Sequence, residues 1–324
     1  MKTEKILLVR TGGLGDSLLI WPAVRALRQS FPDAYMELMG TKHRLAPMLV
    51  AGGADVASDL DGSGYHHLLL ADSQIPQWVR DRFGAFDIVI AFSSQGDLAL
   101  GENLSDCGVG EVHVFLPFSA PGSGVHVARH TMDLLASVGL VDSGNLGDEL
   151  QGVLPVTDAE SEAGNRALQD LRVSGRDLVL VAPGSGSEKK NWFASGFIRV
   201  INTLSDESYR VVMIEGPADE EPVERIRKAI PSVPVLRHLT PSVLKGVMSR
   251  CRLFIGNDSG LAHLAGLVGA PCVVVFKTSD PRLWRPLGQV QVLGPLSQDF
   301  NTGRDVDPDD VMDACHHLLD SGDI

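Results

Sequence analysis

The sequence predicts an α/β protein made of two doubly wound domains with a cleft between them. Short apolar runs alternate with helical patterns, which is typical of a mostly parallel sheet covered on both faces. The chain has 324 residues, about twice the length of a single domain of roughly 150 residues. The alternation lapses over residues 141–154, where glycines and acidic side chains replace the periodic pattern. We therefore expect one domain over 1–155 and a second over 156–324.

In the first domain, the apolar run at residues 6–9 predicts a buried strand, and a glycine-rich turn and a helix follow it. Later apolar runs alternate with helical patterns in the same way. The predicted strands are 6–9, 35–39, 68–70, 87–92 and 112–116. The predicted helices are 16–30, 74–82 and 125–139.

The second domain is expected to open with a helix over 158–171, after which the alternation restarts. The predicted strands are 178–181, 210–214, 233–236, 253–255 and 272–276. The predicted helices between them are 194–204, 220–230, 241–250 and 259–268. A last helix is expected from Pro308 to about 319, with Asp307 as its N-cap.

The charge balance limits the classes of partner. The chain carries 28 Lys and Arg against 41 Asp and Glu, a net charge of −13. This balance argues against nucleic-acid binding, which needs clustered basic side chains, and against long-range attraction to an anionic membrane. The four cysteines form no CxxC pair, so we expect reduced thiols. The apolar run directly before Arg10 has only four residues, and no apolar run in the chain reaches 18 residues, so we expect a cytoplasmic protein.

Three segments combine a strand end, glycines and polar side chains. The first is Arg10-Thr11-Gly12-Gly13-Leu14-Gly15-Asp16-Ser17, between the first strand and its helix. In open α/β sheets, ligands bind at the carboxyl ends of strands, and glycines let them approach the backbone. Asp16 then faces the expected cleft, although a simple helix-capping role explains an aspartate there equally well. The spacing matches neither GxGxxG nor a P-loop.

The second segment, residues 182–192, occupies the same topological position in the second domain. Its Gly/Ser-rich loop offers backbone N–H groups and hydroxyls to phosphate oxygens, and Lys190 can supply positive charge. A solvated loop is the alternative. Two consecutive lysines directly before Trp192 favour the anion-binding interpretation.

The third segment, residues 254–263, is a strand that ends in Gly-Asn-Asp and a helix that begins at Ser259. His263 lies one helical turn after Ser259 and shares its face. A histidine there is either part of the site or an ordinary core residue. The next strand leads into Lys277 at the same sheet edge.

No metal site is expected. Asp59-Leu60-Asp61 matches a DxD pattern but has no buried strand before it, and the pairs His66-His67 and His316-His317 lack a third ligand at a suitable spacing. The sequence therefore predicts neither a metal nor another cofactor.

Together the three segments resemble the glycosyltransferase family 9 heptosyltransferases, which add heptose to the lipopolysaccharide inner core. The resemblance spans nearly the whole chain and rests on RTGGLGDSLLIWPAVRAL, PGSGSEKKNWF and GNDSGLAHLAGLVGAPCVVVF, the last followed by TSDP. It implies a GT-B fold, in which two Rossmann-like domains face a central cleft. The acceptor binds to the first domain and the nucleotide sugar to the second. The last helix, at about 308–319, typically crosses back toward the first domain.

The resemblance also implies roles for individual residues. Asp16 matches the family's proposed general base, which leaves Gly12 and Gly13 on the acceptor side. Glu215 falls where the family often contacts the adenosine. The implied donor-binding residues are Ser185, Gly186, Ser187, Lys190, Asp258, Ser259, Gly260, Leu261 and His263.

Three basic positions have two interpretations each. Lys42 and Arg44, on either side of His43, either meet an anionic acceptor or begin a solvated helix. Lys277 stands where family members often have Gly-Pro, and it is either a phosphate or acceptor contact or a surface lysine.

The implied reaction needs a base for the acceptor hydroxyl and a means of stabilising the leaving diphosphate. One carboxylate in one domain and an anion site in the other supply both without a metal. The expected enzyme inverts the anomeric centre, uses an ADP-heptose-like donor and acts on a glycolipid or oligosaccharide acceptor. Transient association with the inner face of the membrane would bring it to a lipid-linked acceptor.

Three alternatives remain open. A transferase of the same fold could use another donor or acceptor, because only a few pocket contacts would change. A non-catalytic protein could retain the sugar-nucleotide site, although it would have no need of Asp16. An epimerase on the same fold would require an acid/base pair in the second domain, and the sequence offers no convincing pair.

Overall fold

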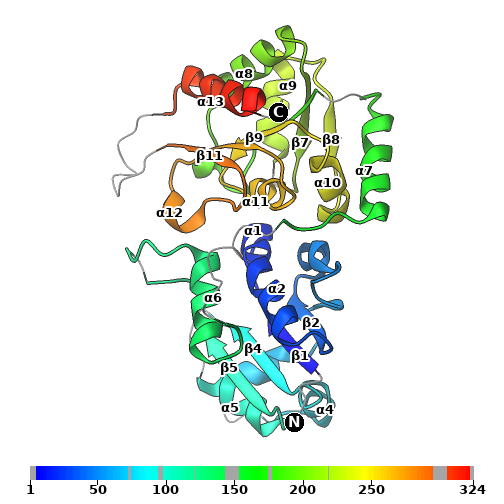
Figure 1. Ribbon diagram of the computed structural model, residues 1–324, viewed down its shortest axis with the longest axis vertical. Helices are drawn as coiled ribbons and strands as arrows, with labels where there is room; N and C mark the ends of the chain where they lie inside the picture. Colours follow the sequence, from blue (N-terminus) through cyan, green and yellow to red (C-terminus); the bar gives the residue numbers. More distant parts are fainter. Residues whose placement is uncertain are drawn as a thin grey trace. The chain divides into compact units, whose positions relative to one another are not determined.

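The chain divides into two compact units, Met1–Leu150 and Gln151–Ile324. The computed structural model describes residues 5–71, 74–93, 98–120, 122–142, 153–173, 177–217, 219–294 and 305–321. The linker predicted at 141–154 lies largely outside the described residues. Figure 1 colours the chain along the sequence, from blue at the N-terminus through green to red at the C-terminus.

Each unit contains one parallel sheet, so the predicted α/β class is confirmed. The strand order is β3-β2-β1-β4-β5 in the first unit and β11-β10-β9-β6-β7-β8 in the second. The strands of the first sheet are β1 Lys5–Val9, β2 Tyr35–Gly40, β3 Val56–Asp59, β4 Ile88–Phe92 and β5 Glu111–Phe115. Those of the second are β6 Leu178–Ala182, β7 Arg210–Glu215, β8 Val235–Arg237, β9 Leu253–Asn257, β10 Cys272–Val275 and β11 Val290–Leu293.

Helices and short 3₁₀ turns connect these strands (Figure 1). Those of the first unit are α1 Leu14–Leu18, α2 Trp21–Ser30, α3 Lys42–Leu45, η1 Ala46–Met48, η2 Tyr65–Leu69, α4 Gln77–Phe83, α5 Leu98–Asp106 and α6 Val127–Ser137. Those of the second are α7 Asp158–Asp170, η4 Glu188–Lys190, α8 Ala194–Asp206, α9 Glu220–Ala229, α10 Pro241–Met248, α11 Gly260–Leu267, α12 Pro281–Trp284 and α13 Pro308–Ser321.

Central strands are apolar on both faces because helices cover both sides of each sheet. All described side chains of β4, β6, β9 and β10 are buried. In the second unit, side chains from one face of the sheet form a single core with α8, α9 and α13. None of the described helices is both long and apolar enough to cross a membrane.

Two predictions in the first unit were wrong: the strand at 68–70 and the single helix at 16–30. Residues 68 and 69 belong to η2, and Leu70 follows it. The Asn103 amide donates to the carbonyls of Leu68 and Leu70. The strand beside β2 is instead β3, whose pattern is weak because it lies at the sheet edge with Val56 exposed.

The helix predicted at 16–30 is two helices. Pro22 has no N–H to continue the hydrogen-bond ladder, and its ring is disfavoured within a helix but accepted in a first turn. The chain accordingly ends α1 at Leu18 and starts α2 at Trp21, with Pro22 in its first turn. Three further elements were not predicted: α5, the four-residue helix α12 and the edge strand β11.

The final helix, for which the resemblance implied a crossing toward the first domain, buries its apolar side in the second unit. Val311, Cys315 and Leu318 of α13 join the core formed with α8. The guanidinium of Arg252 donates to the carbonyl of Leu319 and anchors the end of the helix.

Helices α7 and α10 pack at unusually short range through two glycines. A Cβ at Gly164 would overlap the backbone of Gly246, and a Cβ at Gly246 would overlap the carbonyl of Glu160. The fully buried Lys245 forms an ion pair with Glu160, with 2.8 Å between nitrogen and oxygen. Burial lowers the pKa of Lys245, and the Glu160 carboxylate partly offsets this.

Gly246→Ala is expected to destabilise the second unit by about 1–3 kcal/mol, because the added methyl group separates the two helices. The effect outweighs the better helix propensity of alanine, which is worth about 1 kcal/mol. Gly101→Ala in α5 is the matched control, since its Cβ meets only a Val114 methyl at 3.7 Å. Chemical denaturation should show a lower free energy of unfolding for Gly246→Ala and no decrease for Gly101→Ala. Equal stabilities of the two variants would contradict the close packing of α7 and α10.

Candidate active site

The glycine-rich turn after β1 folds around the carboxylate of Asp16. The backbone N–H of Gly13 donates to Asp16 Oδ2 at 2.8 Å. Gly12 has φ +123°, and a Cβ at this position would lie 2.7 Å from the same oxygen. A glycine is therefore required here, because an L side chain would be strained and would displace the half-buried carboxylate.

Two arginines bind the carbonyls of this turn. Arg44 from α3 donates to the carbonyl of Gly12 at 2.6 Å. Arg10, the residue after β1, donates through Nε to the carbonyl of Asp16 at 3.2 Å. Arg44, expected on the acceptor side, thus supports the turn from which Asp16 projects. Lys42 is exposed, and its backbone N–H binds Asp59 Oδ1 at 2.8 Å.

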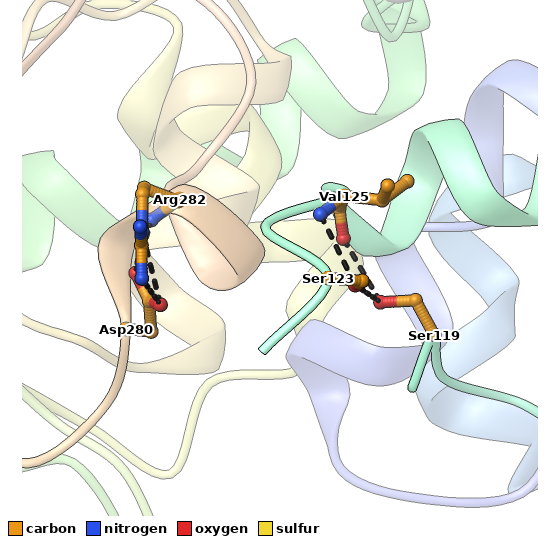
Figure 2. A network of polar contacts seen from close by, with 5 residues as sticks. All are labelled: Ser119, Ser123, Val125, Asp280 and Arg282. Atoms are coloured by element: carbon orange, nitrogen blue, oxygen red, sulfur yellow. Dashed lines mark hydrogen bonds and ion pairs between the residues drawn. The ribbon is translucent and has the colours of Figure 1, made fainter. Parts of the chain in front are cut away.

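The segment between β5 and α6 lies at the carboxyl edge of the same sheet, because it too follows a parallel strand. Ser123 Oγ donates to Ser119 Oγ at 3.0 Å, and Ser119 Oγ donates to the carbonyl of Val125 at 3.1 Å (Figure 2). The backbone N–H of Val125 donates back to Ser123 Oγ. His126 then caps α6 by accepting from the N–H of Ala128 at 3.2 Å.

In the second unit, the structure brings together two of the predicted donor-binding residues. The ammonium group of Lys190 lies 2.7 Å from Asp258 Oδ2. The Lys190 side chain is 36% exposed, whereas that of Asp258 is only 6% exposed. The pair forms because β6 and β9 are neighbours, so the loops that follow them begin side by side. One accessible cation therefore lies next to one buried anion.

The loop after β6 is ordered by its own side chains. Ser185 Oγ contacts Asn191 Oδ1 at 2.6 Å and the carbonyl of Ser187 at 2.8 Å. Between them, Gly186 is exposed at φ +72°, and a Cβ there would meet nothing within 4 Å. The tip of the loop is therefore free of side chains, which allows close approach by a phosphate group, while the N–H of Gly186 itself donates to Asp219 Oδ1.

Ser259 caps α11 by accepting from the N–H of Ala262 at 3.4 Å. Gly260 and Leu261 form the first turn, and His263 follows as a buried residue whose N–H donates to the carbonyl of Ser259. The start of α11 thus lies directly after Asp258, at the carboxyl edge where Lys190 also projects. A helix N-terminus at this place favours negatively charged groups.

Two further residues hold this region, and neither was predicted from the sequence. Asn257 is fully buried: its amide donates to the carbonyl of Pro183 at 2.7 Å and accepts from the N–H of Trp192 at 2.8 Å. Asp219, 6% exposed, accepts from the N–H groups of Gly186 and Gly216, each at 3.2 Å. Asn257, the last residue of β9, binds the loop after β6, and Asp219, the N-cap of α9, binds the loops after β6 and β7. A polar residue at the end of an apolar strand was the available signal for Asn257.

The comparisons with known proteins identify the family of this chain. The model of glycosyltransferase family 9 (heptosyltransferase) matches residues 117–311. The chain belongs to glycosyltransferase family 9. Lipopolysaccharide heptosyltransferase 3 of Escherichia coli is 23% identical over 301 residues, which cover 84% of this chain and 83% of the relative.

Two solved structures share the fold of this family 9 glycosyltransferase. A family 9 glycosyl transferase from Veillonella parvula has a TM-score of 0.79 at 19% identity, covering 99% of this chain and 98% of the other. The E. coli ADP-heptose LPS heptosyltransferase II has a TM-score of 0.75 at 16% identity, covering 99% of this chain and 100% of the other. The predicted GT-B fold of two Rossmann-like domains is confirmed, and so is the prediction of a glycosyltransferase.

Two other predicted contacts of the glycosyltransferase are engaged in ion pairs. Glu215 Oε2 lies 2.8 Å from the guanidinium of Arg237, its partner in the β7–β8 register. Lys277 lies 2.9 Å from Asp305 Oδ1. Glu215 thus links β7 to β8, and Lys277 links the residues after β10 to those before α13. A role of either residue toward the donor remains a prediction.

The TSDP turn of the family motif also has a local function. Asp280 accepts from the backbone N–H of Arg282 at 2.9 Å and caps α12, and the Arg282 guanidinium binds the same carboxylate (Figure 2). This hydrogen bond from Arg282 lowers the pKa of Asp280.

Within the part of the chain that the structure describes, no group of three or more His, Cys, Asp or Glu side chains is arranged to hold a metal ion. The four cysteines are free thiols. Burial raises the pKa of Cys251 and of Cys315 to about 12, so these thiols stay protonated at neutral pH.

Asn257→Ala is expected to destabilise the glycosyltransferase by about 2–4 kcal/mol, because the Pro183 carbonyl and the Trp192 N–H lose their buried partner. The loop that carries Lys190 should also bind ADP less tightly. The control is Arg166→Ala, which removes an exposed surface pair with Glu162 and should change the free energy of unfolding by less than about 1 kcal/mol. Normal stability and ADP affinity in Asn257→Ala would show that the loop is held by other contacts.

Proposed function

We propose that this glycosyltransferase moves a heptose from ADP-heptose to a hydroxyl group of a lipopolysaccharide core, with inversion at the anomeric carbon and without a metal ion. The observation that carries the proposal is the anion-binding arrangement in the second unit. Lys190, the accessible loop around Gly186 and the start of α11 all follow neighbouring strands of one sheet. A nucleoside diphosphate has the charge and shape that such an edge favours.

The ADP-heptose donor is supported by the relatives. The E. coli heptosyltransferase II is named for ADP-heptose, and the family description is that of heptosyltransferases. In this chain, Ser185, Gly186, Ser187 and Lys190 would contact the diphosphate. Asp258 would keep Lys190 in position, and the residues from Ser259 to His263 would contact the sugar side of the donor.

The proposed mechanism is a single displacement. Asp16 accepts the proton of the acceptor hydroxyl while that oxygen attacks the anomeric carbon. The bond from this carbon to the phosphate oxygen breaks, and its electron pair leaves with ADP. The ammonium group of Lys190 and the N-terminus of α11 stabilise the charge that develops on the diphosphate. One attack from the side opposite the leaving group inverts the configuration.

The turn around Asp16 suits the role of a base. Gly13 holds Oδ2 at 2.8 Å, which fixes the orientation of the carboxylate and leaves the other oxygen to accept a proton. Gly12 and Gly13 keep the approach to it free of side chains.

The acceptor assignment is supported by the relatives named as lipopolysaccharide heptosyltransferases. Lys42, exposed at the carboxyl edge of the first sheet, would contact an anionic core sugar. An enzyme that acts on a lipid-linked core at the cytoplasmic face would dock on the inner membrane only transiently.

Asp16→Asn should lower kcat by about 10²–10⁴-fold, because the amide cannot accept the proton. ADP affinity should stay unchanged, since asparagine can still accept from the N–H of Gly13. Asp87→Asn is the matched control: this carboxylate accepts from the N–H of Lys5 at 2.9 Å at the opposite, amino edge of the same sheet. The measurement is the steady-state rate of ADP release for each variant. If both variants turned over normally, Asp16 would have no role as the base.

Lys190→Ala should weaken ADP binding by about 1–3 kcal/mol, roughly 5- to 150-fold in Kd, through loss of a charge-assisted contact. Part of this loss comes from the unpaired Asp258 carboxylate, so adding Asp258→Asn should recover some affinity. Lys189→Ala, one residue earlier and exposed, should bind ADP normally. Calorimetric titrations in EDTA measure these affinities without metal ions, and equal Kd values for the two lysine variants would contradict the assignment.

A further inference from the structure

Arg10 is a buried arginine next to the proposed base. Arg10 is only 1% exposed, and it directly follows the apolar strand β1. Among the residues that the structure describes, the guanidinium forms no ion pair, and its Nη2 atom has no hydrogen-bond partner. Burial lowers the pKa of Arg10, and the nearby Asp16 charge partly offsets this. An apolar side chain of similar volume would be less costly to bury.

The contacts of Arg10 join two segments far apart in the sequence. Nε donates to the carbonyl of Asp16 at 3.2 Å, and Nη1 lies 3.4 Å from the carbonyl of Pro117. Both are backbone groups, one in α1 and the other in the segment after β5. The guanidinium therefore links the helix that carries the base to the segment that leads into α6.

Aromatic rings fix the plane of the guanidinium. The ring of Phe92 lies 5.4 Å from its central carbon, and the ring of Phe118 lies 5.1 Å away. Phe92 ends β4, and Phe118 belongs to the same segment as Pro117. Because the guanidinium is planar and its donors have fixed directions, holding the plane also sets the positions of both carbonyls.

The helix that bears Asp16 needs such support. With five residues, α1 has too few internal hydrogen bonds to set its own orientation. The carboxylate is held by Gly13, while the backbone of Asp16 is held by Arg10. Movement of this turn would carry the carboxylate with it.

We propose that Arg10 is a positioning residue that holds Asp16 in place by binding its carbonyl, and that it couples this position to the segment between β5 and α6. This inference rests on the proposed function of Asp16 as the base. Arg10 touches no substrate in this account. A shift of the carboxylate by about 1 Å is enough to lower the rate by roughly 100-fold.

The test compares three variants with the wild-type enzyme. Arg10→Met removes both donors, and Arg10→Lys keeps the charge but not the fixed fork of donors. Arg28→Met is the structural control. Arg28 also binds backbone carbonyls, those of Gly53 at 3.0 Å and Ala34 at 2.6 Å, and pairs with Asp55 at 2.7 Å.

The readouts are kcat per ADP-binding site, the Kd of ADP and the unfolding midpoint, with ADP-heptose and a de-acylated lipopolysaccharide core as substrates. Arg10→Met should lose about 100-fold in kcat and Arg10→Lys about tenfold, both with nearly unchanged ADP affinity. Arg28→Met should lose stability and keep its kcat within about twofold.

The inference is overturned if Arg10→Met loses no more kcat than Arg28→Met. If Arg10→Met does not fold, Arg10→Lys decides, and a wild-type kcat in that variant contradicts the proposal. Asp16→Asn is measured beside them. Normal turnover in Asp16→Asn would show that the proposed base is wrong, whereas an inactive Asp16→Asn with normal Arg10 variants would refute only the positioning role.

Discussion

The parallel pairing of β6 with β9 is the constraint on which the proposed donor-binding region depends. In this register Ala182 lies opposite Gly256, so Pro183, the first residue after β6, and Asn257, the last residue of β9, lie side by side although 74 residues separate them in sequence. Asn257 then binds the carbonyl of Pro183 and the N–H of Trp192, which closes the loop against the end of β9. With both ends of the loop fixed, Lys190 reaches Asp258. An accessible positive charge is thereby held at the start of α11.

The first unit uses the same principle with a different chemical result. The strand β1 lies between β2 and β4, so the turn that follows it lies at the centre of the carboxyl edge. Glycines let this turn fold around a carboxylate, and Arg10 and Arg44 bind its carbonyls. The second unit thus presents a cation beside a helix N-terminus, and the first presents an oriented carboxylate. A proton acceptor and an anion site are the two groups that transfer from a sugar diphosphate requires.

The sequence predicted the parts of this arrangement that are encoded locally. Apolar runs located the central strands because these are buried on both faces, and glycines after them located the turns around Asp16 and Gly186. Edge elements such as β3 were not predicted, because their mixed burial leaves no periodic pattern in the sequence. The roles of Asn257 and Asp219 were not predicted for another reason. Their partners lie many residues away, and a single sequence does not state which strands are neighbours.

Arg10 shows the same limit most clearly. From the sequence, Arg10 has no role of its own beyond its place at the start of the glycine-rich segment, and Arg44 is either an acceptor contact or part of a solvated helix. In the structure Arg10 is 1% exposed between two aromatic rings, and Arg44 supports the Gly12 carbonyl. The charge of these two residues can be read from the sequence, but the direction of each side chain depends on a distant partner: Pro117, 107 residues later, for Arg10, and Gly12, 32 residues earlier, for Arg44.

The central claim is that the second unit binds an adenosine diphosphate group, and nucleotide-dependent unfolding tests it most directly. The unfolding midpoint would be measured with ADP, UDP, GDP and dTDP, each at millimolar concentration. At 100 times its Kd, a ligand adds about 2.7 kcal/mol to the free energy of unfolding. The account predicts a clear increase with ADP and little with the other three. A larger increase with UDP, GDP or dTDP, or none with any of the four, would contradict it.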